Sequence, residues 1–175
     1  HYAGWTDKYS QVCSSVNPVA LSHFNFSTPD PTGVVGIFAP DTPSLLGLVT
    51  LTAQTILSGN TVIVLASETA PLSAISLAEV FATSDLPGGV VNILTGNRAE
   101  IAPWLASHMD VNAIVDGSGD KKTFAVLQTG ASDNLKRVSD HSLPTSEAWF
   151  TEAATDAYRI LDTVEYKTAW HPIGV

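Results

Sequence analysis

The chain has 175 residues, of which 45% are hydrophobic and 14% charged, and its formal net charge at pH 7 is −9. This length suits one domain with a sizeable core, and the apolar content excludes a disordered chain. The acidic balance argues against a nucleic acid or an anionic membrane as partner, since both bind basic surfaces. The sequence has no apolar run of about 18 residues, as a membrane-spanning helix requires. We therefore expect one globular domain that binds neither nucleic acid nor membrane.

The N-terminus and the cysteine content indicate the compartment. Residues 1–8 have no basic segment followed by an apolar core, so they do not resemble a signal peptide. The single cysteine, Cys13, excludes an internal disulfide and argues against a cysteine-based zinc site. Cys13 lies in a short amphipathic pattern without a glycine turn, so we expect a partly buried side chain and not a nucleophile. The five histidines are scattered, and we expect no metal site and a cytoplasmic location.

Short apolar runs alternate with helical patterns between residues 34 and 138. The apolar runs are rich in β-branched residues, as in strands that are buried on both faces. A strand about every 25 to 30 residues, with a helix between, indicates right-handed βαβ units. The sequence thus predicts a doubly wound, Rossmann-like α/β domain, a parallel sheet with helices on both faces. The predicted strands are 34–39, 61–65, 90–94, 112–115 and 135–138; the predicted helices are 43–58 and 71–81, one from Gly96 to about 108, and one from Gly119 to Gln128.

Ligands of such sheets bind beyond the carboxyl ends of the strands, where the N–H groups of helix N-termini favour anions. The loops predicted at this edge are 40–43, 66–70, 95–98 and 116–120. We expect any small-molecule site of the domain there.

The tail after residue 145 has a different pattern. Thr145-Ser146-Glu147 begins a predicted helix, and residues 163–170 then alternate with a period of two, which is typical of a strand with one exposed face. We expect residues 1–145 to form the α/β domain and residues 146–175 to form a C-terminal helix-and-strand extension. The apolar positions of the predicted helix are Trp149, Phe150, Ala153, Ala157 and Ile160.

The predicted C-terminal strand has two possible uses. If its edge pairs with another sheet, Tyr166 and Trp170 are the residues that we expect to contact a partner. The alternative is that the strand completes the sheet of its own domain. The pattern alone does not distinguish the two.

Several motifs occur in a family-specific order. They are Tyr2-Ala3-Gly4-Trp5-Thr6-Asp7-Lys8, Pro31-Thr32-Gly33-Val34-Val35-Gly36, Gly59-Asn60-Thr61-Val62, Pro87-Gly88-Gly89-Val90-Val91-Asn92 and Asn134-Leu135-Lys136-Arg137-Val138. Together they resemble the coenzyme-binding half of the aldehyde dehydrogenase superfamily. The tail, residues 166–174, resembles the end of the sixteenth aldehyde dehydrogenase family, whose members join a complete dehydrogenase unit to a degenerate second one. By this resemblance, the chain is similar to that second unit.

The resemblance implies a reaction in which a Cys thiolate attacks an aldehyde, an Asn side chain holds the oxyanion, NAD(P) accepts hydride and a Glu activates water. Here Pro40-Asp41-Thr42 stands where the family has Pro-Trp-Asn, and His141 falls in register with the Glu. No cysteine follows Cys13. Thr42 is instead expected to cap the next helix, and His141 to be a loop residue. We therefore expect no catalytic residue, and no catalysis by this chain alone.

The same resemblance places coenzyme contacts at Glu68, Gly117 and Ser118. Leu65 replaces a Lys that bonds the adenosine ribose, whereas Glu68 remains and either accepts a ribose hydroxyl or is a solvated loop carboxylate. Gly117 and Ser118 either meet a phosphate at a helix N-terminus or form a plain turn. Asp116 adds a negative charge beside the phosphate position. We therefore expect NAD binding to be weak or absent.

Two functions follow from these features. In the first, the chain is a catalytically incomplete scaffold that supports assembly, and NAD-dependent aldehyde oxidation is performed by an upstream dehydrogenase unit of the same polypeptide or by another subunit. In the second, it is a retained NAD-binding module that serves a partner's catalytic site. The lost catalytic positions favour the first, with a homo-oligomeric parent. The sequence does not begin with methionine, and we expect it to be a piece of that longer protein.

Overall fold

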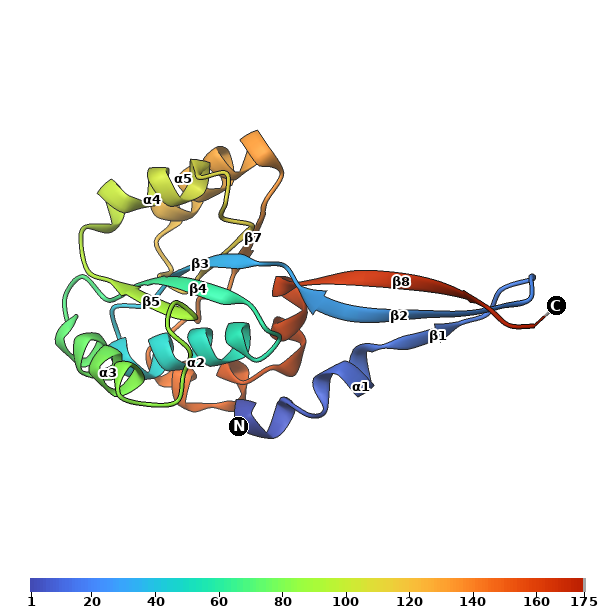
Figure 1. Ribbon diagram of the computed structural model, residues 1–175. Coiled ribbons are helices and arrows are strands. Elements are labelled where there is room, and N and C mark those ends of the chain that lie inside the picture. The colour runs from blue at the N-terminus through green and yellow to red at the C-terminus, as the bar shows by residue number, and fades with distance from the viewer. Residues whose placement is uncertain (175) are drawn as a thin grey trace.

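A five-stranded parallel sheet forms the centre of the computed structural model, which describes residues 1–174 (Figure 1). In spatial order its strands are β5 (Val91–Leu94), β4 (Thr61–Leu65), β3 (Val34–Phe38), β6 (Ala113–Asp116) and β7 (Arg137–Asp140). Every neighbouring pair is parallel. The chain order reverses between β3 and β6, which confirms the doubly wound fold predicted from the sequence.

α-Helices cover both faces of this sheet (Figure 1). α2 (Ser44–Ile56) and α3 (Leu72–Ala82) lie on one face, and α4 (Arg98–Ser107) and α5 (Lys121–Ala131) lie on the other. Each of these helices was predicted, with ends that shift by a few residues. In the described part of the chain, no helix is long and apolar enough to cross a membrane.

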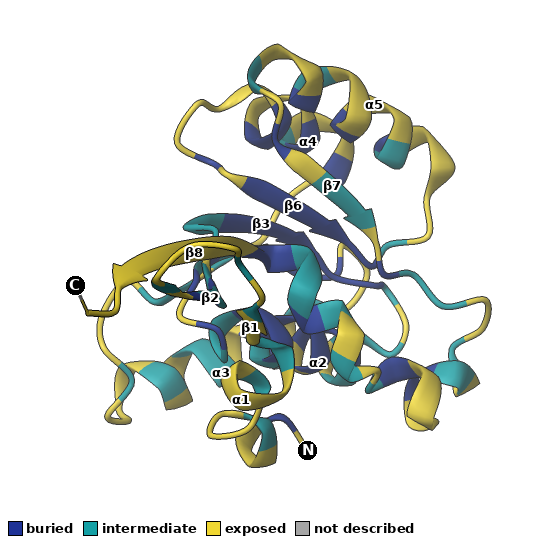
Figure 2. Ribbon diagram, turned by 90° about the vertical axis from the view of Figure 1, so that its right-hand side faces the viewer, coloured by how far each residue is buried: buried dark blue, intermediate teal, exposed yellow. Residues whose placement is uncertain are grey.

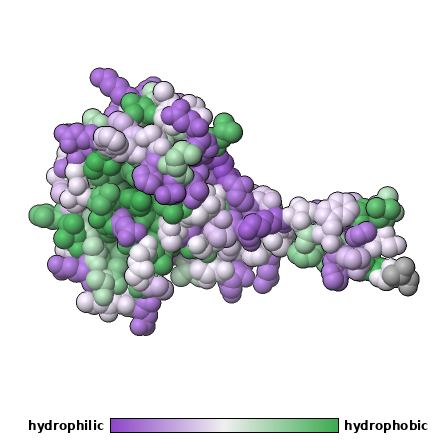
Figure 3. Space-filling view, turned by 45° about the horizontal axis from the view of Figure 1, so that its top comes forward, coloured by the Kyte–Doolittle hydropathy of each residue, from purple (hydrophilic) through white to green (hydrophobic). Residues whose placement is uncertain are grey.

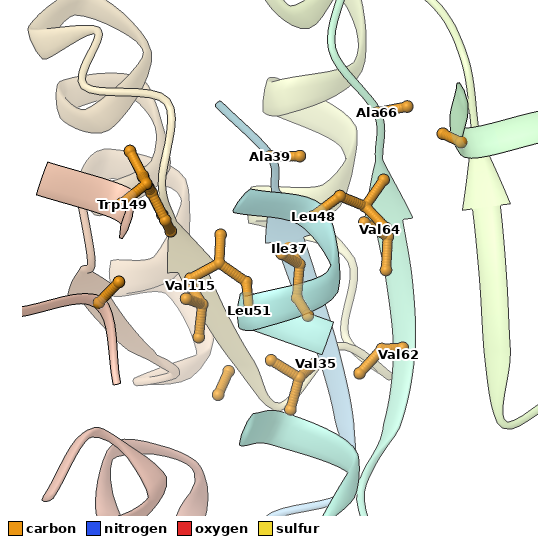
Figure 4. Packing of buried hydrophobic residues seen from close by; sticks show 13 residues of the cluster. Val35, Ile37, Ala39, Leu48, Leu51, Val62, Val64, Ala66, Val115 and Trp149 are labelled. Atoms are coloured by element: carbon orange, nitrogen blue, oxygen red, sulfur yellow. The ribbon is translucent and has the colours of Figure 1, made fainter. Parts of the chain in front are cut away.

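The core consists of two apolar layers, one on each side of the sheet. Alternate residues of β3 point to opposite faces. Val35 and Ile37 pack under α2 (Figure 4), whereas Phe38 belongs to the cluster on the side of α4 and α5. Because both faces are covered, the strands carry nearly continuous apolar runs. Other large side chains of the first layer are Leu48, Leu51, Val62, Val64, Val115 and Trp149. Those of the second layer include Leu65, Leu105, Ile114 and Leu127.

A second, antiparallel sheet projects from this α/β body (Figure 1). It consists of β1 (Ser15–Asn17), β2 (His23–Pro31) and β8 (Val164–Pro172), in that spatial order, and we call it the arm. β2 and β8 pair along their whole length. Before the arm, the chain forms a short 3₁₀ helix, η1 (Tyr2–Trp5), and one helical turn, α1 (Tyr9–Cys13).

The arm excludes one of the two alternatives for the C-terminal strand and corrects one expectation. β8 does not complete the parallel sheet, because it pairs with β2 in a separate sheet. The one buried face predicted for this strand is also wrong, since the residues after Val164 are exposed on both faces (Figure 2). No layer of the body covers the arm there, so the alternation in sequence does not correspond to burial. β2 itself was not predicted, because Asn25, Ser27 and Pro29 interrupt any apolar pattern.

The predicted helix from residue 145 is also wrong. The chain forms three short 3₁₀ helices instead, η3 (Glu147–Phe150), η4 (Glu152–Ala154) and η5 (Ala157–Thr163). The side chains of Thr151 and Asp156 accept hydrogen bonds from the amides two residues ahead, and each therefore starts a new turn. The segment still covers the α2 side of the sheet. The boundary predicted at residue 145 stays a prediction.

Asn60 joins the body to the arm. It is 1% exposed, and its Oδ1 accepts a hydrogen bond from the amide of Gly33, at the start of β3, at 2.8 Å. Its Nδ2 donates to the carbonyl of Thr163, which precedes β8, at 2.8 Å, and to the carbonyl of Thr55 in α2 at 3.2 Å. One buried side chain thus connects both sheets and a helix.

We predict that Asn60→Ala lowers the free energy of unfolding by about 2–3 kcal/mol, because it leaves buried amide and carbonyl groups without partners. Chemical denaturation of the two proteins measures this difference. Gln128→Ala, at an exposed position of α5, is the control and should change stability by less than about 0.5 kcal/mol. Equal effects of the two substitutions would contradict the role of Asn60.

Candidate functional site

The carboxyl edge of the parallel sheet collects the loops that the sequence predicted there. The position where strand order reverses lies between the ends of β3 and β6, and open α/β sheets bind ligands at such a position. Two hollows open at this edge. One, of about 660 Å³, lies at the start of α2 and is lined by Asp41 and Thr42 among others. The other, of about 320 Å³, lies between α5 and β7 and is lined by Asp116, Asp120 and Asp140 among others.

A buried guanidinium lies at the centre of this edge. Arg98, the first residue of α4, is 6% exposed. Its Nη1 lies 3.3 Å from Oδ2 of Asp41, and its Nη2 lies 3.4 Å from Oδ1 of the same carboxylate. Nη2 also donates to the carbonyl of Ala39 at 3.2 Å. Partial burial alone would raise the pKa of Asp41, but the hydrogen bonds from Arg98 and Ser67 and the attraction of the guanidinium hold it below its ordinary value.

Glu68 belongs to the same cluster. One carboxylate oxygen accepts a hydrogen bond from the backbone amide of Arg98, and the other lies 3.9 Å from its guanidinium. The backbone amide of Glu68 donates to Oδ1 of Asp41 at 2.9 Å. Glu68 therefore caps the first turn of α4 and is not simply a solvated loop carboxylate. For it to bind a ribose hydroxyl, these contacts would have to be shared or broken.

The loop between β6 and α5 uses its own oxygen atoms to satisfy its amides. Ser118 N donates to Oδ1 of Asp116 at 2.9 Å, and Asp120 N donates to Oγ of Ser118 at 3.2 Å. In the first turn of α5, the amides of Lys122 and Thr123 donate to the Asp120 carboxylate at 3.0 and 3.3 Å. These are the groups that would bind a phosphate at a helix N-terminus. Carboxylates of the chain itself occupy that role.

Gly117 has a packing function. Its amide donates to the carbonyl of Phe38 at 2.8 Å, across the β3–β6 boundary. A side-chain carbon at this position would lie 2.5 Å from Cδ1 of Leu51 and 3.2 Å from the Phe38 carbonyl oxygen. Glycine is therefore required here by the close approach of α2, whether or not a ligand is bound. The coenzyme contacts assigned to Glu68, Gly117 and Ser118 stay predictions.

Asp116 is a buried carboxyl group at the end of β6. It is 1% exposed and stands opposite Asp140 of β7 in the parallel register. Burial raises its pKa, the Asp140 charge adds to this effect, and hydrogen bonds from Ser118 oppose it. Its carboxylate form is thus destabilised by the fold. A second anion beside it, such as a phosphate, would increase that cost.

His141 and Thr42, which the resemblance places at the family's catalytic positions, have structural surroundings. His141 is 1% exposed; its Nδ1 lies 2.6 Å from Nε2 of Gln54, and its Nε2 lies 2.7 Å from Oδ2 of Asp162. Both ring nitrogens are therefore engaged. Thr42 does not cap α2 as expected, because the helix begins one residue later than predicted, Pro43 takes the capping position, and that position has no side-chain hydrogen bond. Thr42 lines the larger hollow instead.

Neither the thiol of Cys13 nor a metal centre contributes a reactive group to this edge in the described part of the chain. Cys13 lies in α1, near the base of the arm, and burial raises the pKa of its thiol, which disfavours the thiolate (Figure 1). Among residues 1–174, no group of three or more His, Cys, Asp or Glu side chains is placed to hold a metal ion.

The sequence reasoning missed Arg98 and the capping role of Asp120. The signal for Arg98 was its position. A cation at a helix N-terminus is unfavourable, so an Arg there indicates a nearby carboxylate partner. The signal for Asp120 was Asp followed by a helical pattern, which is typical of an N-cap.

Comparisons with known proteins agree with the geometry of the sheet. A sequence profile described as the Aldehyde dehydrogenase family matches residues 1–162. The chain belongs to this family. An aldehyde dehydrogenase of Emericella nidulans is 30% identical over 139 residues, which are 79% of this chain and 27% of that protein. The cytosolic 10-formyltetrahydrofolate dehydrogenase of Mus musculus is 31% identical over 140 residues, 79% of this chain and 16% of that protein.

Solved structures of the family superpose on the chain. The NAD⁺ complex of an aldehyde dehydrogenase from Bacillus cereus gives a TM-score of 0.74 at 26% identity, covering 81% of this chain and 28% of that one. The chain thus spans between 16% and 28% of the length of these relatives. Aldehyde dehydrogenases bind NAD(P), and the residues of this chain do not fit that group well, because its loop amides and its buried guanidinium are already bound to carboxylates. The resemblance to the sixteenth family stays a prediction.

We predict that Arg98→Met lowers the free energy of unfolding by about 3 kcal/mol, because it leaves the Asp41 and Glu68 charges without their common partner. Lys8→Met is the matched control. Its side chain is largely exposed, and its ammonium group contacts the exposed Asp7 carboxylate and the carbonyl of Gly4, so its loss should change stability by less than about 1 kcal/mol. Urea denaturation measures both. A small effect of Arg98→Met would mean that the cluster does not stabilise this edge.

The buried Asp116 carboxyl group predicts a pH dependence. Its raised pKa means that ionisation costs stability above that pKa, and that the cost disappears as the pH falls below the pKa of the unfolded chain. Asp116→Asn should therefore raise Tm at pH 7 by a few degrees, or about 1 kcal/mol for a chain of this size, and the gain should vanish near pH 4.

Asp120→Asn is the control, and it should change Tm at pH 7 in the opposite direction. The hydrogen bonds from Thr123 and Lys122 lower the pKa of Asp120, so its loss should reduce Tm at pH 7 and have less effect in acid. Melting curves at several pH values separate the two cases. A stability loss for Asp116→Asn at pH 7 would contradict the destabilised carboxylate.

Proposed function

We propose that this chain is a catalytically incomplete unit of an aldehyde dehydrogenase family protein, and that its function is structural and supports assembly. The observation that carries the proposal is the chemistry of the carboxyl edge, where the amides and the guanidinium that would hold a dinucleotide are bound to the chain's own carboxylates. A dinucleotide would bring two negatively charged phosphates close to the carboxylates of Asp41, Glu68 and Asp116. The single buried guanidinium of Arg98 does not neutralise all of these charges, so binding is disfavoured.

The catalytic positions support the same conclusion. A hydroxyl at Thr42 does not reproduce the reach of a carboxamide N–H toward an oxyanion. His141 is enclosed between Gln54 and Asp162, and it does not line either hollow of the edge. The thiol of Cys13 belongs to α1 and is not activated. We therefore assign the parent's aldehyde oxidation to a complete dehydrogenase unit, either upstream in the same polypeptide or in another subunit.

The assembly role rests on the arm. Its exposed side chains include Tyr166 and Trp170, which are 51% and 58% exposed on the strand β8. A long strand whose edge is open is a template for pairing with another chain. We place the protein in the cytoplasm, as its single cysteine and the named cytosolic relative suggest.

The second candidate function is a retained NAD-binding module. The superposition on an NAD⁺ complex of the family favours it, since the scaffold that holds the coenzyme there is present here. Affinity for NAD⁺ distinguishes the two functions, because a coenzyme carrier must bind at cellular concentrations.

We predict that calorimetric titration with NAD⁺ gives a millimolar dissociation constant or no heat of binding. A complete aldehyde dehydrogenase, titrated under the same conditions, is the positive control. A micromolar constant for this chain would overturn the structural assignment and establish the coenzyme-binding module.

A further inference from the structure

The hollow of about 320 Å³ between α5 and β7 combines carboxyl groups with an apolar wall. Asp116 and Asp140 stand opposite each other in the parallel register, so both side chains point to the face of the sheet that α5 covers. Asp120, the residue before α5, also lines the hollow. Three carboxyl groups therefore share one small cavity.

One face of α5 forms the wall of this hollow. Phe124 and Ala125 line it, and Lys121 and Gln128 line it one turn before and one turn after. Residues at this spacing lie on the same side of a helix. Phe124 is half-buried, and the face of an aromatic ring attracts cations.

Apolar surface alone does not distinguish the hollow, because hydrophobic side chains also gather in a patch on the face of the body drawn in Figure 3. Its distinguishing feature is the combination of an aromatic wall with a buried carboxyl group. Pockets that bind small molecules have this composition, an apolar lining with a few polar groups that orient the ligand.

The carboxyl group of Asp116 has an oxygen without a partner in this hollow. Asp116 is 1% exposed, and its Oδ1 accepts a hydrogen bond from the amide of Ser118 at 2.9 Å. Within residues 1–174, no donor forms a hydrogen bond with its Oδ2. A buried acceptor without a donor costs free energy, and a ligand that donates a hydrogen bond removes this cost.

The charge of Asp116 also lacks a counterion. The ion pairs formed by residues 1–174 involve other carboxylates, so none of them reaches Asp116, Asp120 or Asp140. Burial and the neighbouring Asp140 charge both raise the pKa of Asp116, which means that the fold destabilises its carboxylate. A buried charge is stable only when it is paired. The group that the hollow lacks is therefore a cation.

We propose that this hollow binds a short aliphatic amine in its ammonium form, with the ammonium group on Asp116 and the alkyl chain along Phe124 and Ala125. The Asp140 and Asp120 carboxylates lie in the same cavity and add to the attraction. An ammonium group has three donors and no acceptor, which suits a group of carboxylates. This inference goes beyond the structural function proposed above and does not depend on it.

Other classes of ligand fit the hollow less well. An anion is repelled by the three carboxyl groups, and an uncharged apolar molecule leaves Oδ2 of Asp116 without a donor. The described residues also place no group of three or more His, Cys, Asp or Glu side chains to hold a metal ion. A cation with an apolar chain satisfies both the carboxyl groups and the aromatic wall.

Lys121 opposes this binding to a small extent. It lines the hollow, but its side chain is exposed, so solvent screens its charge. Because it competes for the same carboxylates, its removal is expected to favour a bound amine.

The first experiment compares an amine with an uncharged molecule of the same shape. Calorimetric titration of the 175-residue chain with butylamine at pH 7 should give a dissociation constant at or below about 1 mM. It is performed in about 0.15 M sodium chloride, which screens exposed charges. 1-Butanol, which has the same alkyl chain and no charge, should give no heat of binding.

The second experiment identifies the site by substitution. Asp116→Asn keeps the size of the side chain and removes its charge, so it should weaken butylamine binding at least tenfold. Since the same substitution is expected to raise Tm, a loss of binding is not due to misfolding. Phe124→Leu should weaken binding several-fold through the loss of the ring, and Lys121→Met should strengthen it.

Asp133→Asn is the matched control for charge. Asp133 is an exposed carboxylate in η2 (Ser132–Asn134), at the other end of α5, and its loss should leave the dissociation constant unchanged. An equal effect of Asp133→Asn and Asp116→Asn would show that only the overall charge of the chain attracts the amine, and would overturn the site.

The remaining outcomes are equally decisive. Absence of butylamine binding in sodium chloride, equal binding of 1-butanol, or unchanged binding after Asp116→Asn overturns the proposal. The NAD⁺ titration tests the structural function separately, so the failure of one does not imply the failure of the other.

Discussion

The charge interaction of Arg98 with two carboxylates determines how well the carboxyl edge of the sheet can bind an anionic ligand. A guanidinium at the first residue of α4 is opposed by the helix dipole, and it is held there by Asp41 and Glu68. The anions that this edge of an α/β sheet ordinarily receives from a ligand are supplied here by the protein. The loop before α5 repeats the same arrangement with Asp116 and Asp120. The result is an edge at which carboxylates of the chain itself bind loop amides and the Arg98 guanidinium.

The sequence predicted the parallel domain because each of its elements carries a local signal. The run 61–65 is apolar after its first residue, Thr61, and it is found as β4 with the predicted bounds. β2 could not be predicted in this way. Its nine residues include Asn25, Ser27 and two prolines, and they form a strand only because β8 pairs with them from the far end of the chain. Local propensity carries no information about such a distant partner. The edge cluster is equally non-local, since Asp41, Glu68 and Arg98 follow three different strands.

Part of the family motif is retained here for reasons of packing. Gly117 is required by the approach of Leu51, and Asn60 is required by the amide of Gly33 and the carbonyl of Thr163. These residues therefore serve the scaffold itself, whether or not a coenzyme is bound.

The pairing of β2 with β8 joins residues 23–31 to residues 164–172. During synthesis β2 leaves the ribosome before β8, and almost all of the body is made between the two strands. Contacts of such wide sequence separation form late, because the intervening chain has to be ordered first. Throughout that interval the polar side chains and prolines of β2 limit its tendency to aggregate. The same polar residues and prolines that make β2 difficult to predict from sequence thus also reduce aggregation of the nascent chain.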